Sequence, residues 1–167
     1  MSNVIAMLRE QLELVDLPFT QKPILIGGMA MEYYGIRQSG KDIDLVICDD
    51  DYQQLSTSMP DKRKDIYGDL GIVTGPFEIW RSIALLDYSF YLKDAIDEEI
   101  AYVVSIDRLL LTRVIAMDVE KYRNDLKLMT GYYYKTYTNH QFLLESEKRK
   151  SSYAKNNGIV FGGHYDE

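Results

Sequence analysis

The sequence has few of the residues that often hold small proteins together or bind metal. It contains one cysteine, Cys48, and two histidines among its 167 residues. A single cysteine excludes an internal disulfide, and His140 and His164 lie too far apart to indicate a zinc site or a catalytic triad. No apolar run is long enough to span a membrane, and the first residues lack the pattern of a signal peptide. We therefore expect a cytoplasmic protein.

Acidic residues outnumber basic ones, and the imbalance is uneven along the chain. The net charge is −7. Residues 1–120 contain 11 basic and 21 acidic side chains, whereas residues 121–167 contain 8 basic and 5 acidic ones. Because an acidic body binds nucleic acid poorly, a polynucleotide partner would have to contact the basic C-terminal part. The alternative is a solvated surface without a partner, which is the commoner origin of such an asymmetry.

Hydrophobic spacing predicts both helices and strands along the chain. Predicted strands cover residues 23–27, 42–48, 77–83, 84–92 and 100–104. Predicted helices cover residues 3–16, 28–35, 49–59, 106–130 and 132–150, and residues 60–77 are expected to form an irregular loop. This order predicts an α/β (α+β) fold, in which helices flank a small mixed sheet. We expect one domain over residues 1–150 and a C-terminal tail over residues 151–167.

A glycine pair and two nearby acids form the most informative part of the sequence. Gly27 and Gly28 end an apolar run, at a point where backbone N–H groups and a helix N-terminus favour phosphate. Asp42 and Asp44 share one face of the next strand because side chains alternate, and Mg²⁺ is the usual partner of such a pair. The two features together indicate a nucleotide-using enzyme. The alternative is a tight turn without a ligand, followed by two exposed acids.

The run GGMAMEYYGIRQSGKDIDLVI resembles the signature of the nucleotidyltransferase superfamily, a glycine pair followed by Asp-x-Asp. It is most similar to the small bacterial and phage branch that includes abortive-infection and toxin-type nucleotidyltransferases. A second stretch, from Ser105 to Leu126, resembles that branch's S-L-E-D-L-L-x-x-K helix and the K-D-R-x-D-L run after it. The sequence departs from these patterns at Gly28, Arg113 and Tyr122, where Ser, Lys and Asp respectively are common.

The resemblance implies Mg²⁺-dependent transfer of a nucleoside monophosphate from an NTP, such as ATP, to a hydroxyl of RNA, protein or a small molecule. Asp42 and Asp44 would hold the Mg²⁺, together with a third carboxylate from a neighbouring strand. Asp87 is the first choice, because a lone acid within an apolar strand needs a reason. Glu78 is the alternative, and a site without a third acid is the remaining one. The alternative function is an inactive protein with this fold, such as a phage accessory protein or a toxin–antitoxin partner.

Nucleotide contacts are expected from residues close to the two motifs. These residues are Gly27, Gly28, Arg37, Ser39, Lys41 and Arg113. The basic side chains would balance triphosphate charge, and Ser39 would replace the hydroxyl that is missing at Gly28. The alternative is a salt bridge to a nearby acid for Arg37 and Lys41, and a simple surface charge for Arg113.

Overall fold

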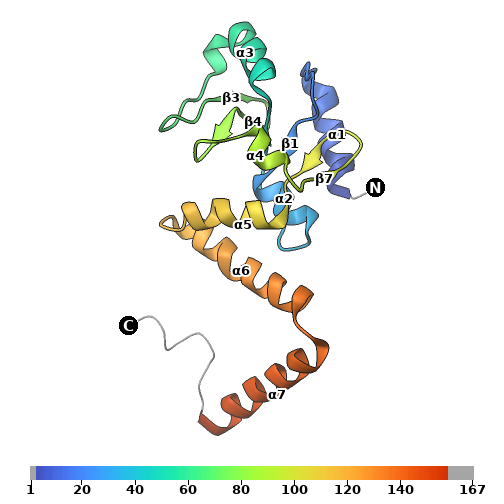
Figure 1. The fold of residues 1–167 in the computed structure, drawn as a ribbon, viewed down its shortest axis with the longest axis vertical. Helices are drawn as coiled ribbons and strands as arrows, with labels where there is room; N and C mark the ends of the chain where they lie inside the picture. Colours follow the sequence, from blue (N-terminus) through green and yellow to red (C-terminus); the bar gives the residue numbers. More distant parts are fainter. Residues whose placement is uncertain (1–2, 158–167) are drawn as a thin grey trace. The chain divides into compact units, whose positions relative to one another are not determined.

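The computed structural model describes residues 3–157 (Figure 1). Contacts divide the chain into two compact units, Met1–Leu128 and Met129–Glu167. The first unit contains every strand among the described residues, together with the candidate site. The second contains the later part of one helix and all of the next. None of the helices within residues 3–157 is both long and apolar enough to cross a membrane.

A six-stranded mixed sheet forms the centre of the first unit, with the strand order β3-β4-β2-β1-β8-β7. The strands are β1 (Ile24–Leu25), β2 (Ile43–Val46), β3 (Gly71–Thr74), β4 (Phe77–Trp80), β7 (Ile96–Asp97) and β8 (Tyr102–Val103). β2 runs parallel to β4, and β1 runs parallel to β8, while the other neighbours are antiparallel. A separate hairpin pairs β5 (Ser82–Ile83) with β6 (Leu86–Asp87). The predicted mixed α/β class is therefore confirmed.

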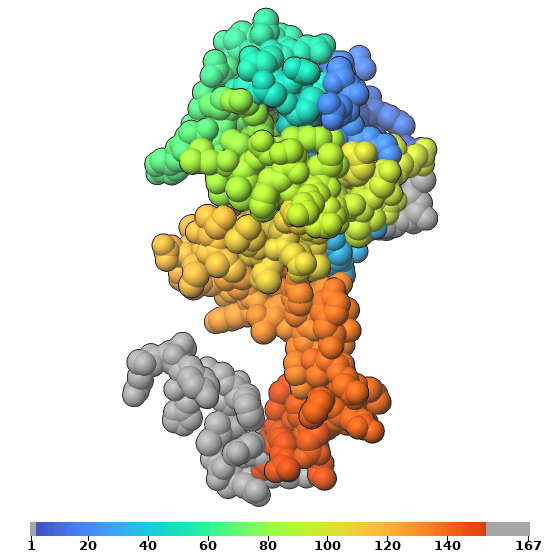
Figure 2. Space-filling model, viewed as in Figure 1, coloured from blue at the N-terminus to red at the C-terminus, as the bar shows by residue number. Residues whose placement is uncertain are grey.

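Seven α-helices and a short 3₁₀ helix lie within residues 3–157. They are α1 (Asn3–Val15), α2 (Gly27–Tyr33), α3 (Asp49–Ser58), η1 (Pro60–Lys62), α4 (Tyr88–Leu92), α5 (Ile106–Ile115), α6 (Glu120–Tyr137) and α7 (His140–Asn157). Figure 2 shows the surfaces of α4 and α5 meeting on one side of the first unit. Arg108 of α5 joins them, because its Nε donates to the Phe90 carbonyl at 2.6 Å.

Alternation along two neighbouring strands separates the core from the candidate site. In β2, Ile43 and Leu45 are buried in the core, whereas Asp44 between them faces the other way. In β4, Phe77 and Ile79 are fully buried around Glu78. The parallel register pairs Asp44 with Glu78, so two carboxylates occupy adjacent positions on the same face of the sheet.

The C-terminal half of the first unit differs from the sequence prediction in two places. The predicted strand over residues 84–92 is present only at β6, because Asp87 caps the helix α4, which occupies Tyr88–Leu92. The predicted single helix over residues 106–130 is also wrong, because residues 116–119 separate α5 from α6. That break has no proline or glycine. Its turn is made by backbone hydrogen bonds, including the one from Val119 N–H to the Ala116 carbonyl.

Three further elements lie in segments where no regular structure was predicted. The expected loop over residues 60–77 contains η1 and the whole edge strand β3, and β7 was not predicted at all. Both strands are short, and β7 is exposed throughout. A short strand on the edge of a sheet carries little hydrophobic periodicity, so its sequence does not distinguish it from a loop.

Candidate functional site

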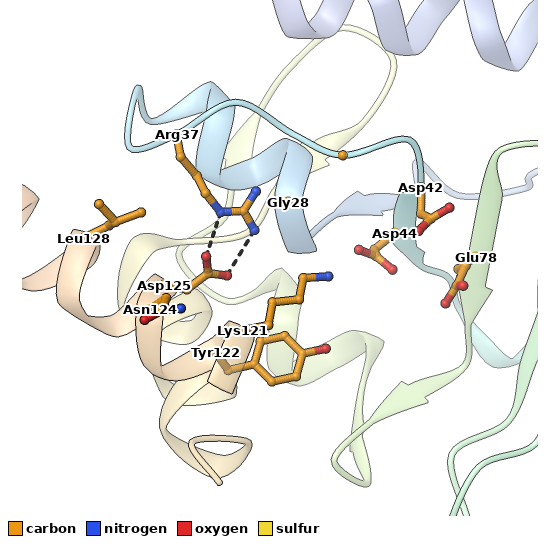
Figure 3. A pocket seen from close by; sticks show the side chains of 11 residues that line it. Gly28, Arg37, Asp42, Asp44, Glu78, Lys121, Tyr122, Asn124, Asp125 and Leu128 are labelled. Carbon is orange, nitrogen blue, oxygen red and sulfur yellow. Dashed lines mark hydrogen bonds and ion pairs between the residues drawn. The ribbon is translucent and has the colours of Figure 1, made fainter. Parts of the chain in front are cut away.

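A cleft of about 500 Å³ opens beside the acidic face of the sheet. Eleven residues line it, and Figure 3 shows how they face one another across the opening. Asp42, Asp44 and Glu78 come from the sheet side, while the first turns of α6 provide the opposite wall, including Lys121 and Asn124. This volume falls within the range of small-molecule sites.

Asp44 is the carboxylate on the sheet side whose pKa is clearly raised. Burial is the largest cause and the negative charge of Glu78 the next, and together they bring the pKa of Asp44 to about 6. Arg113 and Lys121 act in the opposite direction, and Asp42 adds a smaller upward contribution. The charged form of Asp44 is therefore disfavoured in the cleft, mainly because the side chain is buried. A bound cation would stabilise that charged form.

Gly27 allows the backbone to lie directly against Asp44. Its φ of +66° belongs to the left-handed region, and a Cβ added there would lie 2.0 Å from Asp44 Oδ2. Either fact alone disfavours any other residue. Gly28 differs, because an added Cβ would meet only ordinary contacts, the nearest being Arg37 Nη1 at 3.5 Å. The first glycine is thus explained by packing against Asp44, and the second lines the cleft.

Asp125 of α6 binds two arginines that the sequence analysis assigned to the nucleotide. Arg37 donates to it through Nε at 2.6 Å and through Nη2 at 3.1 Å, and Arg113 Nε donates at 3.0 Å. Burial opposes ionisation of Asp125, which is 3% exposed, but the two guanidinium groups hold its pKa below the usual value. Arg37 Nη1 also donates to the Gln38 carbonyl at 2.8 Å. The salt-bridge alternative therefore describes Arg37, and Arg113 is buried rather than a surface charge.

Lys121 is the cation that extends toward the carboxylates. It lies at the start of α6, and Figure 3 shows its side chain between the helix and Asp44. Tyr122 beside it has the Arg113 guanidinium 5.0 Å and the Lys121 ammonium 5.7 Å from its ring centroid. The two cations therefore already contact this ring, which orders the wall next to the acids.

Glu78 has a partner outside the cleft lining. Lys64, from the segment between η1 and β3, pairs with Glu78 at 2.8 Å and lies 5.7 Å from the centroid of the Trp80 ring. Lys64 thus neutralises one of the three acids from the side of β3. Both side chains are partly exposed, which limits the strength of the pair.

Asp87, the predicted third carboxylate, is not brought to this cleft. It is the N-cap of α4 and accepts hydrogen bonds from Ser89 Oγ at 2.7 Å and Phe90 N–H at 3.0 Å, which lower its pKa. It lines a second, smaller pocket of about 250 Å³ that also includes Arg81. The physical reason is local, because the carboxylate is used to begin a helix. The alternative acid, Glu78, lies beside Asp44 instead.

Two other predicted contacts lie outside the cleft lining. Ser39 donates to Glu32 through both its N–H at 2.9 Å and its Oγ at 2.5 Å, and these bonds lower the pKa of Glu32. Its hydroxyl therefore does not replace the one missing at Gly28. Lys41 is exposed, one residue before Asp42.

The wall formed by α6 was largely missed. Four of its five cleft residues, at 121, 124, 125 and 128, follow the i, i+3, i+4, i+7 spacing of a single helix face. That spacing is visible in the sequence, with a polar residue or an acid at three of the four positions. The predicted single helix over residues 106–130 was assigned only an apolar stripe, so this polar face was not identified.

The donor set of the cleft fits Mg²⁺ that arrives with a nucleotide better than a permanent metal cage. Within residues 3–157, no group of three or more His, Cys, Asp or Glu side chains is arranged to hold a metal ion. Mg²⁺ commonly uses one or two carboxylates and takes its remaining oxygens from substrate phosphates and water. Asp42 and Asp44 could provide the carboxylates, and Glu78 lies next to them.

Comparisons with protein-family models, curated proteins and solved structures give no match to this chain.

Proposed function

We propose that the protein is a Mg²⁺-dependent nucleotidyltransferase, which moves a nucleoside monophosphate from an NTP to a hydroxyl acceptor. The observation that carries the proposal is the grouping of Asp42, Asp44 and Glu78 in one cleft opposite Lys121. Excess negative charge on a rigid sheet, facing a lysine, suits a ligand made of a divalent cation and phosphates. The glycine pair and Asp-x-Asp motif support the same reading.

The chemistry would require positioning and charge neutralisation more than reactive side chains. Asp42 and Asp44 would hold the Mg²⁺, which would neutralise the triphosphate and align the acceptor hydroxyl. Lys121 would pair with a phosphate oxygen. Glu78 would accept the proton of the acceptor hydroxyl or provide a further oxygen ligand. The acceptor oxygen forms a bond to the α-phosphorus as pyrophosphate leaves. RNA, proteins and small molecules all carry suitable hydroxyls.

An inactive nucleotide-binding protein with the same fold is the second candidate. One observation favours it, namely that Lys64 already pairs with Glu78 at 2.8 Å. A third carboxylate held by a lysine is less available for catalysis. This candidate predicts nucleotide binding without turnover, as expected for a phage accessory protein or a toxin–antitoxin partner.

A thermal-shift experiment tests the proposal directly. Mg²⁺ together with an NTP should raise the melting temperature of the wild type, and the double variant Asp42→Asn, Asp44→Asn should lose that rise. The control variant Asp50→Asn, Asp61→Asn changes two exposed acids outside the cleft and should keep it. A full rise in the cleft variant would contradict the proposal. Pyrophosphate release with candidate acceptors then separates an enzyme from the inactive candidate.

A further inference from the structure

The cleft has two chemically different ends. The acids lie at one end with Lys121, while Asn124 and Leu128 lie toward the other (Figure 3). Leu128 is 45% exposed although it is a large apolar side chain. An amide and an apolar side chain make a surface unlike the acidic end.

The charged side chains at the far end already have partners within the protein. Arg37 and Asp125 form a two-bond ion pair there, and Arg113 Nε also donates to Asp125. Since Arg37 Nη1 is bonded to a backbone carbonyl, every nitrogen of that guanidinium has a partner. This end therefore offers no free guanidinium to a phosphate. The other lining residues there, Asn124 and Leu128, are uncharged.

The helix α6 arranges the two ends in a fixed order. Lys121 and Leu128 are seven residues apart, which corresponds to about 10 Å along a helix axis. Asn124 lies between them, one turn before Leu128. A nucleotide presents its phosphates at one end and its base, with polar edges and an apolar face, at the other. The wall thus matches a nucleotide that lies along α6.

We infer that the far end of the cleft binds the nucleobase, and that Asn124 makes it select adenine. This inference rests on the proposed function and specifies ATP as the preferred NTP. An Asn amide offers one donor and one acceptor, which match the amine and ring nitrogen of adenine. The usual partner of guanine is a free Arg fork, and Arg37 is occupied by Asp125.

The ring of the base would lie against Leu128. Tyr122 is a less suitable platform, because Arg113 and Lys121 already contact its ring. Cytosine carries a similar donor and acceptor pair but has a single ring, so it should rank after adenine.

Calorimetric titration of the full chain with Mg²⁺ and each of the four NTPs tests the inference, with inorganic tripolyphosphate as the ligand that lacks a base. We expect ATP to bind about tenfold more tightly than GTP or UTP, with CTP between them, and tripolyphosphate to bind more weakly than ATP. Asn124→Ala should bring ATP to the level of GTP. Leu128→Ala should weaken ATP while leaving tripolyphosphate unchanged. The control Gln54→Ala changes an exposed polar residue of α3 and should have no effect.

The outcomes separate the two proposals. If Mg²⁺–tripolyphosphate and all four NTPs bind with equal affinity, and Asn124→Ala changes none of them, the base site is overturned while the nucleotidyltransferase proposal stands. If no NTP binds with Mg²⁺, the proposed function fails, and titration with adenosine alone decides the base site. Adenosine binding that Asn124→Ala removes would support that site, and its absence would overturn it. Circular dichroism of each variant checks that α6 is intact.

Discussion

Two acidic pockets lie along the same pair of parallel strands, but their carboxylates differ in the partners that they have within the protein. The larger cleft holds Asp42, Asp44 and Glu78 beside β2 and β4. The smaller one lies where these strands end, and it contains Asp49 and Asp87. In the smaller pocket Asp49 is paired with Arg81, and Asp87 caps α4. The chain itself therefore satisfies both acids there.

The pKa values of Asp87 and Asp44 shift in opposite directions, in agreement with this difference. Hydrogen bonds from Ser89 and Phe90 lower the pKa of Asp87, so its charge is stabilised by its own helix. Burial and Glu78 raise the pKa of Asp44 to about 6, so its charge is not stabilised by the protein alone. An acid of the first kind supports the fold, whereas an acid of the second kind indicates a cation site. Four substitutions test this distinction.

The largest effect is expected from Asp44→Asn, which should make the ligand-free protein more stable at pH 7.5 by about 2 kcal/mol after allowing for solvent screening. The folded pKa of about 6 lies above the ordinary value of 3.8, so the folded state holds the proton more tightly. Stability therefore falls as the pH rises from about 4 to 6, and the penalty is complete above 6. Urea unfolding at pH 7.5 should show the gain, and unfolding at pH 4 should not. A variant less stable than wild type at pH 7.5 would contradict the cation-site interpretation.

Glu78→Gln should weaken Mg²⁺-dependent nucleotide binding by about tenfold, a loss of about 1.4 kcal/mol. The reason is that Glu78 lies beside Asp44 in register and shares its cleft. Asp87→Asn is the matched control and should bind as the wild type does. Titration calorimetry gives both affinities. The reverse result, with binding lost in Asp87→Asn and kept in Glu78→Gln, would restore Asp87 as the third carboxylate.

Asp87→Ala should instead lower stability, by about 1 kcal/mol, because α4 loses the side chain that accepts the Phe90 N–H. Ser at position 87 can also cap a helix, so Asp87→Ser should recover most of the loss. Thermal unfolding of both variants without ligand measures this. An unchanged melting temperature in Asp87→Ala would show that the cap contributes little.

The smallest effect is expected from Lys64→Met. Removing this partner leaves Glu78 without its ion pair, so Mg²⁺–nucleotide affinity should increase about threefold while stability changes by less than about 0.5 kcal/mol. Lys62→Met, two residues earlier in η1, is the matched control and should leave the affinity unchanged. Weaker binding in Lys64→Met would mean that Lys64 contacts the nucleotide itself.

The sequence alone determined the local features of this site. The spacing of Asp42 and Asp44 placed both acids in the cleft, because side chains alternate along a strand and one neighbour is always buried. The order of the early elements also followed from the sequence, since the apolar runs of α1, β1 and β2 and the boundaries of α2 and α3 are visible in it. The position of Gly27, before the two acids, is also visible in the sequence.

Only the tertiary structure decided between Glu78 and Asp87. Both are acids in apolar surroundings in the sequence, but strand register sets Glu78 beside Asp44, while local hydrogen bonds commit Asp87 to capping α4. The ion pair of Arg37 could not be predicted either, because its partner Asp125 is 88 residues away in the sequence. The two side chains meet only in the folded first unit. Strand register and long-range ion pairs depend on how distant segments meet, and the period of a single segment contains no information about that.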